Sequence, residues 1–230
     1  MVTIVSSSAI HLQKKAPKMT PSKLYSWPGS GNGYKIRLLA SLLGIKLDVV
    51  NIDRRRDEHY SAEFLAINPR GQVPVLVDGD KTFTDSAAIL TYLAGSYPNP
   101  GSIKSPSSFW SNDIAEQAAI IDWLAFAASW IQTGVATARY IRLFHPDDTS
   151  ASTESIVARA TVKGHKSLEI LQARLLAKEW LVLGRPTIAD IAVFVYVSLA
   201  PAGNISLEPY PAIQNWIARI HDLPGFIPFE

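Results

Sequence analysis

The hydrophobic pattern of this 230-residue chain changes at one place, the segment YPNPG at residues 97–101, with Pro106 just beyond it. Proline and glycine break regular structure, so this segment marks a boundary. Before it, short strand-like apolar runs alternate with stretches of helical spacing, and after it every apolar pattern is helical. We therefore expect an α/β domain over residues 22–98, a linker over 99–106 and an all-helical domain over 107–230.

The first region has the predicted order β-α-β-α-β-β-α. Gly44 follows the first helical stretch and is the residue type expected to end a helix. The segment DGD at residues 78–80 is expected to turn a hairpin. The predicted elements, in chain order, cover residues 23–26, 34–43, 47–52, 61–66, 73–77, 81–83 and 86–94.

The helical region begins with residues 107–132, where five side chains share one apolar stripe: Trp110, Ile114, Ala118, Ile121 and Ala125. Trp123, Phe126 and Trp130 lie off this stripe, so we expect the later turns to bury two faces. Thr187 and Asp190 form a variant of the capping box at the start of another helix. Further helices are expected over residues 156–177 and 210–220.

The chain contains no cysteine, which excludes disulfides, thiolate metal sites and a cysteine nucleophile. Any thiol chemistry therefore needs the sulfur of a ligand. The net charge of +2 gives no strong field to attract nucleic acid or an acidic membrane. The longest apolar run, residues 188–202, extends about a dozen residues past Asp190, short of the ~20 that a membrane span needs. We expect no nucleic-acid partner, no membrane and no metal.

Residues 1–21 differ from the rest of the chain in composition. They contain three consecutive serines and three lysines, and the first acidic residue of the chain is Asp48. A transit peptide is also acid-poor and serine-rich, but it normally carries arginine, which this stretch lacks. We expect a flexible extension ahead of Met19 and a cytoplasmic protein, with mitochondrial targeting as the alternative.

The segment SGNG at residues 30–33 lies in the predicted loop between the first strand and the first helix. Backbone N–H groups at a helix start favour an anion, and small residues allow a ligand to come close. An ordinary turn would have the same composition, so this segment is weak evidence when taken alone.

The segment GQVP at residues 71–74 places Pro74 at the start of a predicted strand. An X-Pro bond adopts the cis form far more readily than any other peptide bond. A cis bond before Pro74 would turn the backbone of Val73 outward, toward an extended peptide ligand. An ordinary edge-strand proline is the alternative.

The segment TDS at residues 84–86 enters the third predicted helix. Ser86 is suited to cap that helix, whose free N–H groups can hold a carboxylate. Asp85 beside it can hold an ammonium group. This pair matches both charges of an amino-acid head group, although capping alone would explain the serine.

Together these segments resemble the glutathione-binding domain of the cytosolic glutathione transferase superfamily. The matching text is LYSWPGSGNGYKIRLLASLLGI, HYSAEFLAINPRGQVPVL and FTDSAAILTYL, and the helical region adds GRPTIADIAVF, similar to the N-capping segment of the family's core helix. The resemblance extends over residues 22–225, and its motifs occur in the family's order. It implies a thioredoxin-like N-terminal domain, an all-α C-terminal domain, glutathione as co-substrate and a homodimer.

The loop at residues 30–33 is most similar to the serine- and asparagine-type members, which include theta-like, bacterial nu-like and fungal nitrogen-regulator-like proteins. Beta- and omega-type members use a cysteine in this loop, and this chain has none. Alpha-type members use a tyrosine nearby. We interpret Tyr25 as structural, because it falls one position early and inside the predicted strand.

The resemblance also implies how the tripeptide is held. The backbone of Val73, before Pro74, pairs with the cysteinyl part of glutathione, and Asp85 and Ser86 bind the γ-glutamyl head. Many members have glutamate where this chain has Asp85, whose side chain is one methylene group shorter.

The resemblance places His59 and Gln72 near the glycine end of glutathione, and Ser30 and Asn32 at the sulfur. A thiol has a pKa near 8.5, and a decrease of one to two units needs roughly 1.4–2.7 kcal/mol of preference for the anion. One hydrogen bond to a charged group contributes about 1.5–3 kcal/mol, so a single donor suffices. The sequence leaves open whether Ser30 or Asn32 is the residue that donates to the sulfur.

These inferences predict a glutathione S-transferase that attacks an electrophilic, apolar co-substrate. Its second-substrate wall is expected to include the aromatic residues Trp110, Trp130, Tyr140 and Phe144. Arg139 and Arg142 either meet an acidic substrate or face water. The alternatives are glutathione-dependent reduction of peroxides or disulfides and a non-catalytic regulatory module, because a fold does not determine function.

Overall fold

The computed structural model of the chain describes residues 21–97 and 109–230. The predicted linker over residues 99–106 and the predicted extension, apart from Pro21, lie outside these residues. The first domain contains β1 (Ser22–Ser26), α1 (Gly31–Leu43), β2 (Leu47–Asn51), η1 (Arg54–Arg56), η2 (Glu58–Tyr60), α2 (Ala62–Ile67), β3 (Val75–Asp78), β4 (Lys81–Phe83) and α3 (Ser86–Ser96).

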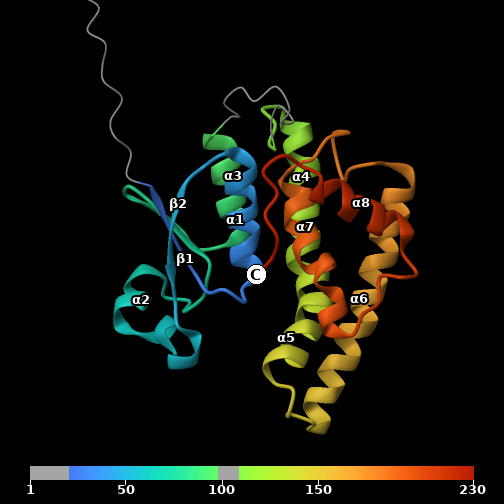
Figure 1. The fold of residues 1–230 in the computed structure, drawn as a ribbon, viewed down its shortest axis with the longest axis horizontal. Helices are drawn as coiled ribbons and strands as arrows, with labels where there is room; N and C mark the ends of the chain where they lie inside the picture. The colour runs from blue at the N-terminus through green and yellow to red at the C-terminus, as the bar shows by residue number, and fades with distance from the viewer. Residues whose placement is uncertain (1–20, 98–108) are drawn as a thin grey trace, which may run out of the picture.

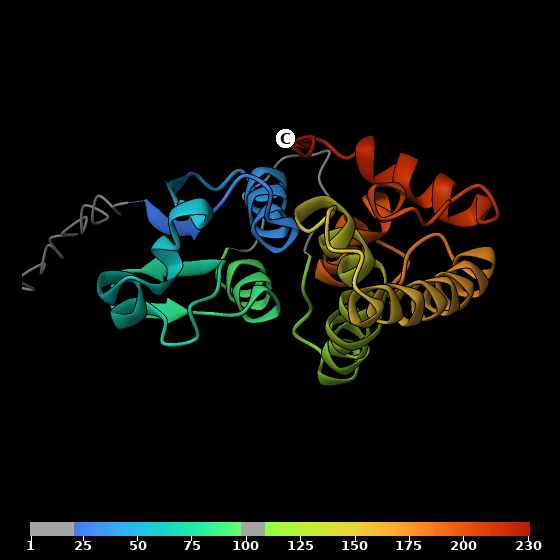
Figure 2. The same ribbon diagram turned by 90° about the horizontal axis from the view of Figure 1, so that it is seen from below.

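Within the described residues, the strands of this domain form one sheet in the order β2-β1-β3-β4. β1 is parallel to β2 and antiparallel to β3, which in turn is antiparallel to β4. The predicted order of strands and helices and the thioredoxin-like fold are confirmed. Helices α1 and α3 lie on the side of the sheet that faces the second domain (Figure 1 and Figure 2).

The second domain is helical throughout its described part, as predicted. It contains α4 (Ile114–Phe126), the π-helix η3 (Ala127–Ala136), α5 (Thr137–Phe144), α6 (Ala151–Ala177), α7 (Ile188–Ser198), the 3₁₀ helix η4 (Ala200–Gly203) and α8 (Pro211–His221). Helix α7 lies at the centre and contacts α1 and α3 of the first domain as well as α4 and η3.

The predicted capping box at the start of α7 is present and fully buried. The Asp190 carboxylate accepts hydrogen bonds from the backbone N–H of Thr187 at 2.9 Å and that of Leu181 at 3.1 Å. It also accepts from the indole N–H of Trp216 at 3.0 Å. One carboxylate thus joins α7, α8 and the preceding loop, and it fixes the helix that carries part of the cavity wall.

The predicted apolar stripe on the first long helix is not the buried one. Ile114 is 77% exposed and Ile121 is 52% exposed, and Ala118 and Ala125 are exposed as well. The buried side chains on this stretch are Ile120, Leu124, Ala127 and Ile131. The helix has two apolar faces, and its sequence does not say which of them the rest of the chain covers.

α4, η3 and α5 continue into one another as a helical stretch from Ile114 to Phe144, which contains an 18-residue window with a mean hydropathy of 1.3. By length and composition alone this stretch is long and apolar enough to cross a membrane. A single such helix is weak evidence, because a core helix of a folded domain passes the same test. Here η3 packs closely on α6, since an added Cβ at Gly134 would lie 2.8 Å from the backbone nitrogen of Gly164.

Candidate functional site

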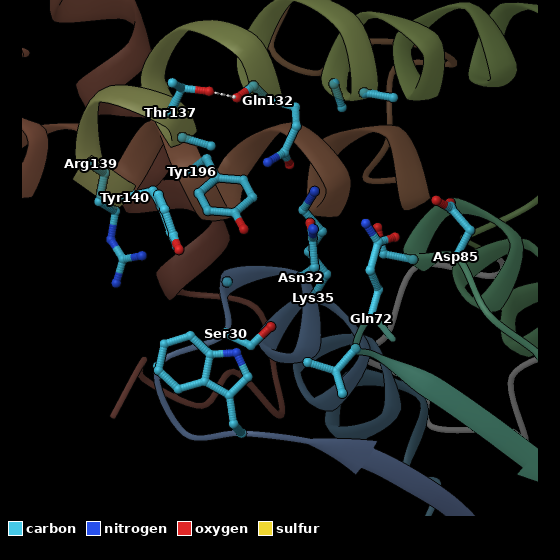
Figure 3. A pocket seen from close by; sticks show the side chains of 18 of the residues that line it. Ser30, Asn32, Lys35, Gln72, Asp85, Gln132, Thr137, Arg139, Tyr140 and Tyr196 are labelled. Atoms are coloured by element: carbon cyan, nitrogen blue, oxygen red, sulfur yellow. Dashed lines mark hydrogen bonds between the residues drawn. The ribbon is translucent and has the colours of Figure 1, made fainter. Parts of the chain in front are cut away.

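A cavity of about 610 Å³ lies between the two domains. One wall comes from the loop after β1, the start of α1, the loop before β3 and the start of α3. The other wall comes from α4, η3, α5 and α7. Figure 3 shows the two walls facing each other, with Ser30, Asn32 and Gln72 below and Thr137, Tyr140 and Tyr196 above.

Ser30 is the N-cap of α1 and lines the cavity. The backbone N–H of Gly33 donates to the Ser30 hydroxyl oxygen at 3.0 Å, and only 7% of Ser30 is exposed. Gly33 has room for no side chain, because a Cβ there would lie 1.9 Å from the Ser26 hydroxyl oxygen. The cap occupies an acceptor site of Ser30 and leaves its own O–H free to donate into the cavity.

Asn32 and Lys35, one turn apart on α1, lie side by side at the cavity (Figure 3). Within the described residues, the side-chain oxygen of Asn32 is buried without a hydrogen-bond partner. Lys35 is only 4% exposed, and its Nζ atom lies 4.9 Å from the centre of the Tyr196 ring. Burial lowers the pKa of Lys35 to about 8, and the Asp85 carboxylate partly opposes this change. The start of α1 therefore combines a hydroxyl, an amide and a buried amine.

The Val73–Pro74 peptide bond is cis, which decides between the two interpretations of Pro74 left open by the sequence. Val73 lines the cavity together with Gln72 and His59, whereas Pro74 is buried and does not line it. The side-chain amide of Asn68 holds this loop by donating to the backbone carbonyl of Gln72 at 2.7 Å.

At the start of α3 the cap is Asp85, one residue earlier than predicted. Its side chain accepts from the backbone N–H of Ala87 at 2.8 Å, and Ser86 is the first residue of the helix. A carboxylate reaches this N–H as well as a hydroxyl does, so local sequence alone did not separate the two. Both residues line the cavity, and the Asp85 carboxylate keeps an oxygen for a ligand.

On the helical wall, Tyr140 and Phe144 line the cavity, but Trp110 and Trp130 do not. Trp110 precedes α4 and lies near Gly95 on α3, where an added Cβ would be 3.8 Å from the Trp110 ring. Trp130 stacks on Phe126, with ring centres 6.1 Å apart. The prediction of these two tryptophans as wall residues is wrong.

The physical reason is helical geometry. This stretch turns one face to the cavity at positions about four residues apart: Leu124, Ala128, Gln132, Ala136 and Tyr140. Trp130 falls midway between two of these positions and so points away. The missing aromatic ring is supplied by Trp27 of the first domain, whose ring centre lies 5.2 Å from that of Phe144.

Two models of glutathione S-transferase domains match this chain. The N-terminal domain model matches residues 20–95, and the C-terminal domain model matches residues 128–224. The chain belongs to the cytosolic glutathione transferase superfamily.

Relatives within the superfamily include both enzymes and regulators by name. Glutathione S-transferase 3 of Zea mays is 27% identical over 90% of this chain and 92% of its own length. Transcriptional regulator URE2 of Saccharomyces cerevisiae is 25% identical over 89% of this chain and 66% of its own length. The solved structure of Ure2p in complex with glutathione has a TM-score of 0.78 and 25% sequence identity, over 90% of this chain and 91% of that one.

Sequence reasoning missed several side chains of this glutathione transferase-family cavity, among them Trp27, Lys35 and Tyr196. A signal existed for Lys35, because a lysine three residues after Asn32 shares its helix face. The other two depend on contacts between distant segments. Gly31 is in contact with Tyr196, since an added Cβ at Gly31 would lie 2.6 Å from the tyrosine ring.

Tyr25 lies in β1 with its ring edge against Phe64, at 6.1 Å between ring centres, and does not line the cavity. Among residues 21–97 and 109–230, no group of three or more histidine and carboxylate side chains is placed to hold a metal ion.

Proposed function

We propose that this protein binds glutathione between its two domains and activates the thiol for attack on an electrophile. The observation that supports this most directly is the geometry of Ser30. Its oxygen accepts the Gly33 N–H, which leaves its own O–H free to donate to a group in the cavity that Ser30 lines. A thiolate placed there receives a hydrogen bond from Ser30 and lies beside the positive end of α1.

The tripeptide is proposed to lie along the first-domain wall. Its ammonium group pairs with Asp85, and its γ-glutamyl carboxylate lies at the N–H groups that begin α3. The backbone of Val73 pairs with the cysteinyl part, and His59 and Gln72 lie at the glycine end. The matching positions of these residues around one cavity support this order.

Thiol activation on this scheme needs no protein base. One hydrogen bond to a charged group contributes about 1.5–3 kcal/mol, enough to lower a thiol pKa by one to two units. The buried amine of Lys35 adds a positive charge beside Asn32. The electrophile then occupies the remaining space between Trp27, Tyr140 and Phe144, where aromatic rings favour a flat apolar group.

Two other functions use the same site. A glutathione-dependent peroxide or disulfide reductase requires the same activated thiol. A non-catalytic module needs only the binding surface, and the similarity to a transcriptional regulator supports this alternative. These alternatives differ in turnover and not in binding.

The decisive experiment combines titration calorimetry with glutathione and two turnover assays, one with 1-chloro-2,4-dinitrobenzene and one with a peroxide. We expect heat of binding and conjugation. Binding without conjugation but with peroxide reduction favours the reductase, and binding without either reaction favours the regulatory module. No heat of binding would reject a glutathione site altogether.

We also propose that the protein is a homodimer with a cytoplasmic location. The exposed apolar face of α4, with Ile114 and Ile121, supports a second copy as the group that covers it. Ile121→Glu places a charge on this face and should shift the sedimentation of the protein to that of a monomer. Ile170→Glu, on the 36% exposed Ile170 of α6, is the control.

A further inference from the structure

Arg139 is a buried cation at the cavity wall. It is the third residue of α5 and is 6% exposed. Its backbone is held from the other side by Gly203 of η4, where an added Cβ would lie 2.6 Å from the Arg139 nitrogen. In Figure 3 its side chain lies next to Tyr140, at the opposite end of the view from Asp85. Arg139 therefore belongs to the part of the cavity beyond the proposed γ-glutamyl position.

Arg139 has no acidic partner. Across residues 21–97 and 109–230 it makes no hydrogen bond and no ion pair, and its Nε atom is buried without an acceptor. Its guanidinium carbon lies 5.4 Å from the centre of the Phe229 ring. Burial lowers the pKa of Arg139, and the nearby Tyr196 hydroxyl partly opposes this change. A cation over a ring gains less than the burial of an ion costs.

The neighbouring arginine on the same helix behaves differently. Arg142 forms a two-pronged ion pair with Glu154, with nitrogen–oxygen distances of 3.0 and 3.2 Å, and does not line the cavity. The fold thus supplies an acid for the arginine that faces away from the site. It supplies none for the arginine that faces the site.

The other charged residues of the cavity wall have interaction partners of their own. Among its lining residues, Lys35, Arg54 and Arg139 are cationic, and Asp85 carries a carboxylate. Lys35 is attracted by Asp85, and Arg54 donates to the Tyr140 hydroxyl and lies over the Trp27 ring at 5.5 Å. Within the described residues, Arg139 is the cation of this group that has no carboxylate partner and makes no hydrogen bond.

We propose that Arg139 is the anion-binding residue of the co-substrate half and selects electrophiles that carry a carboxylate. This inference rests on the proposed function, in which glutathione occupies the other half. It replaces the expectation of a purely apolar co-substrate with that of an aromatic or unsaturated acid. The planar guanidinium can take a carboxylate with two parallel hydrogen bonds.

The test compares two electrophiles of the same shape, 4-chloro-3-nitrobenzoate and 4-chloro-3-nitrobenzamide. In both, the glutathione sulfur forms a bond to the ring carbon and chloride leaves with the bonding electrons. The ratio of their kcat/KM values at saturating glutathione, each divided by the rate constant of that compound's uncatalysed reaction with glutathione, measures the preference for the charge. We expect the wild type to prefer the benzoate, and Arg139→Met to lower that ratio by about tenfold or more, as for the loss of a hydrogen bond to a charged group.

Arg142→Met is the matched control, since it removes an arginine of the same helix outside the cavity, and it should leave the ratio unchanged. Arg139→Lys keeps the positive charge but lacks the two parallel N–H donors of the guanidinium, and it should retain part of the preference for the benzoate. This variant also provides a test if the methionine variant folds poorly. An unchanged ratio in Arg139→Met, or no preference in the wild type, overturns the inference.

A binding measurement separates this inference from the proposed function. Calorimetry with the two conjugates, S-(4-carboxy-2-nitrophenyl)glutathione and its carboxamide, needs no turnover. If Arg139→Met weakens only the carboxylate conjugate, the inference holds even for a non-catalytic protein. If both conjugates and glutathione weaken alike, Arg139 belongs to the glutathione half and the inference fails. If neither conjugate nor glutathione binds the wild type, the proposed function itself fails, and the inference fails with it.

Discussion

The two walls of the cavity hold their polar groups in different ways. On the first-domain wall, Ser30 and Asp85 each accept a backbone N–H of the helix that they begin, at 3.0 and 2.8 Å. On the helical wall, the Nε atom of Arg139 is buried without an acceptor among the described residues, and the backbone of Arg139 packs against Gly203. Local backbone geometry fixes the first wall, while tertiary packing fixes the second and leaves a charge for a ligand to satisfy.

The largest effect is expected from Asp190→Ala, which removes the support of the helical wall. Burial raises the pKa of Asp190 to about 6, so the carboxylate is ionised at neutral pH. Without it the N–H groups of Leu181, Thr187 and Trp216 lose their acceptor, at about 1–3 kcal/mol each. We expect urea denaturation to show a loss of about 3–5 kcal/mol. Asp122→Ala, on an exposed position of α4, should change stability by less than about 0.5 kcal/mol.

Lys35 lies where the walls meet, and its burial predicts a pH-dependent stability. Its pKa is about 8 in the fold against an ordinary 10.5, so the fold disfavours the charged form. This penalty is complete below about pH 8 and disappears as the pH rises toward 10.5. Lys35→Met should therefore be more stable than the wild type at pH 7 by up to roughly 3 kcal/mol, with the difference shrinking by pH 10.

Denaturant titrations at the two pH values check this prediction. Lys46→Met, at an exposed lysine just after α1, should show the same difference at both pH values. A Lys35→Met difference that does not change with pH would contradict a titrating buried amine.

Ser30→Ala tests whether the first-domain wall activates the thiol through the Ser30 hydroxyl. The pKa of the bound thiol should rise by about 1–2 units, and conjugation at neutral pH should fall about 10–100-fold. The ultraviolet absorbance of the thiolate, followed against pH, measures the first effect. Ser61→Ala is matched to it, because Ser61 caps α2 with a 3.1 Å bond from the Phe64 N–H, outside the cavity. It should lose about 1 kcal/mol of stability without any change in the thiol pKa. If Asn32→Ala raises the pKa of the bound thiol and Ser30→Ala does not, Asn32 is the residue that stabilises the thiolate.

The smallest effects are expected from two helical glycines. Gly31→Ala forces a Cβ against the Tyr196 ring, at 2.6 Å, and should cost about 1–2 kcal/mol because the two walls must separate. Gly95→Ala in α3 brings the new Cβ no nearer than 3.8 Å to a side chain or to another segment of the described chain, and it should stabilise the protein by roughly 0.5–1 kcal/mol. Thermal unfolding of both variants measures the difference. Equal shifts of the unfolding midpoint would mean that the Tyr196 ring moves aside at no cost in stability.

The alternation of strands and helices in the first domain and the box of Thr187 with Asp190 were predicted from sequence, whereas the sequence left a cis bond before Pro74 as one of two alternatives and placed the start of α1 three residues too late. Each depends on residues a few positions apart, where backbone conformation and nearby hydrogen-bonding groups decide the outcome. Even the error at α3, where Asp85 caps in place of Ser86, is a shift of one residue between two capable side chains.

The sequence alone therefore determined the elements and the chemical types of the first wall. Only the tertiary structure decided which face of α4 is buried, that Trp27 replaces Trp110 and Trp130 at the cavity, and that Arg139 faces inward while Arg142 pairs with Glu154. The physical reason is range. Caps and turns are set by neighbours along the chain, whereas the covering of a helix face or the pairing of a charge depends on segments that only folding brings together.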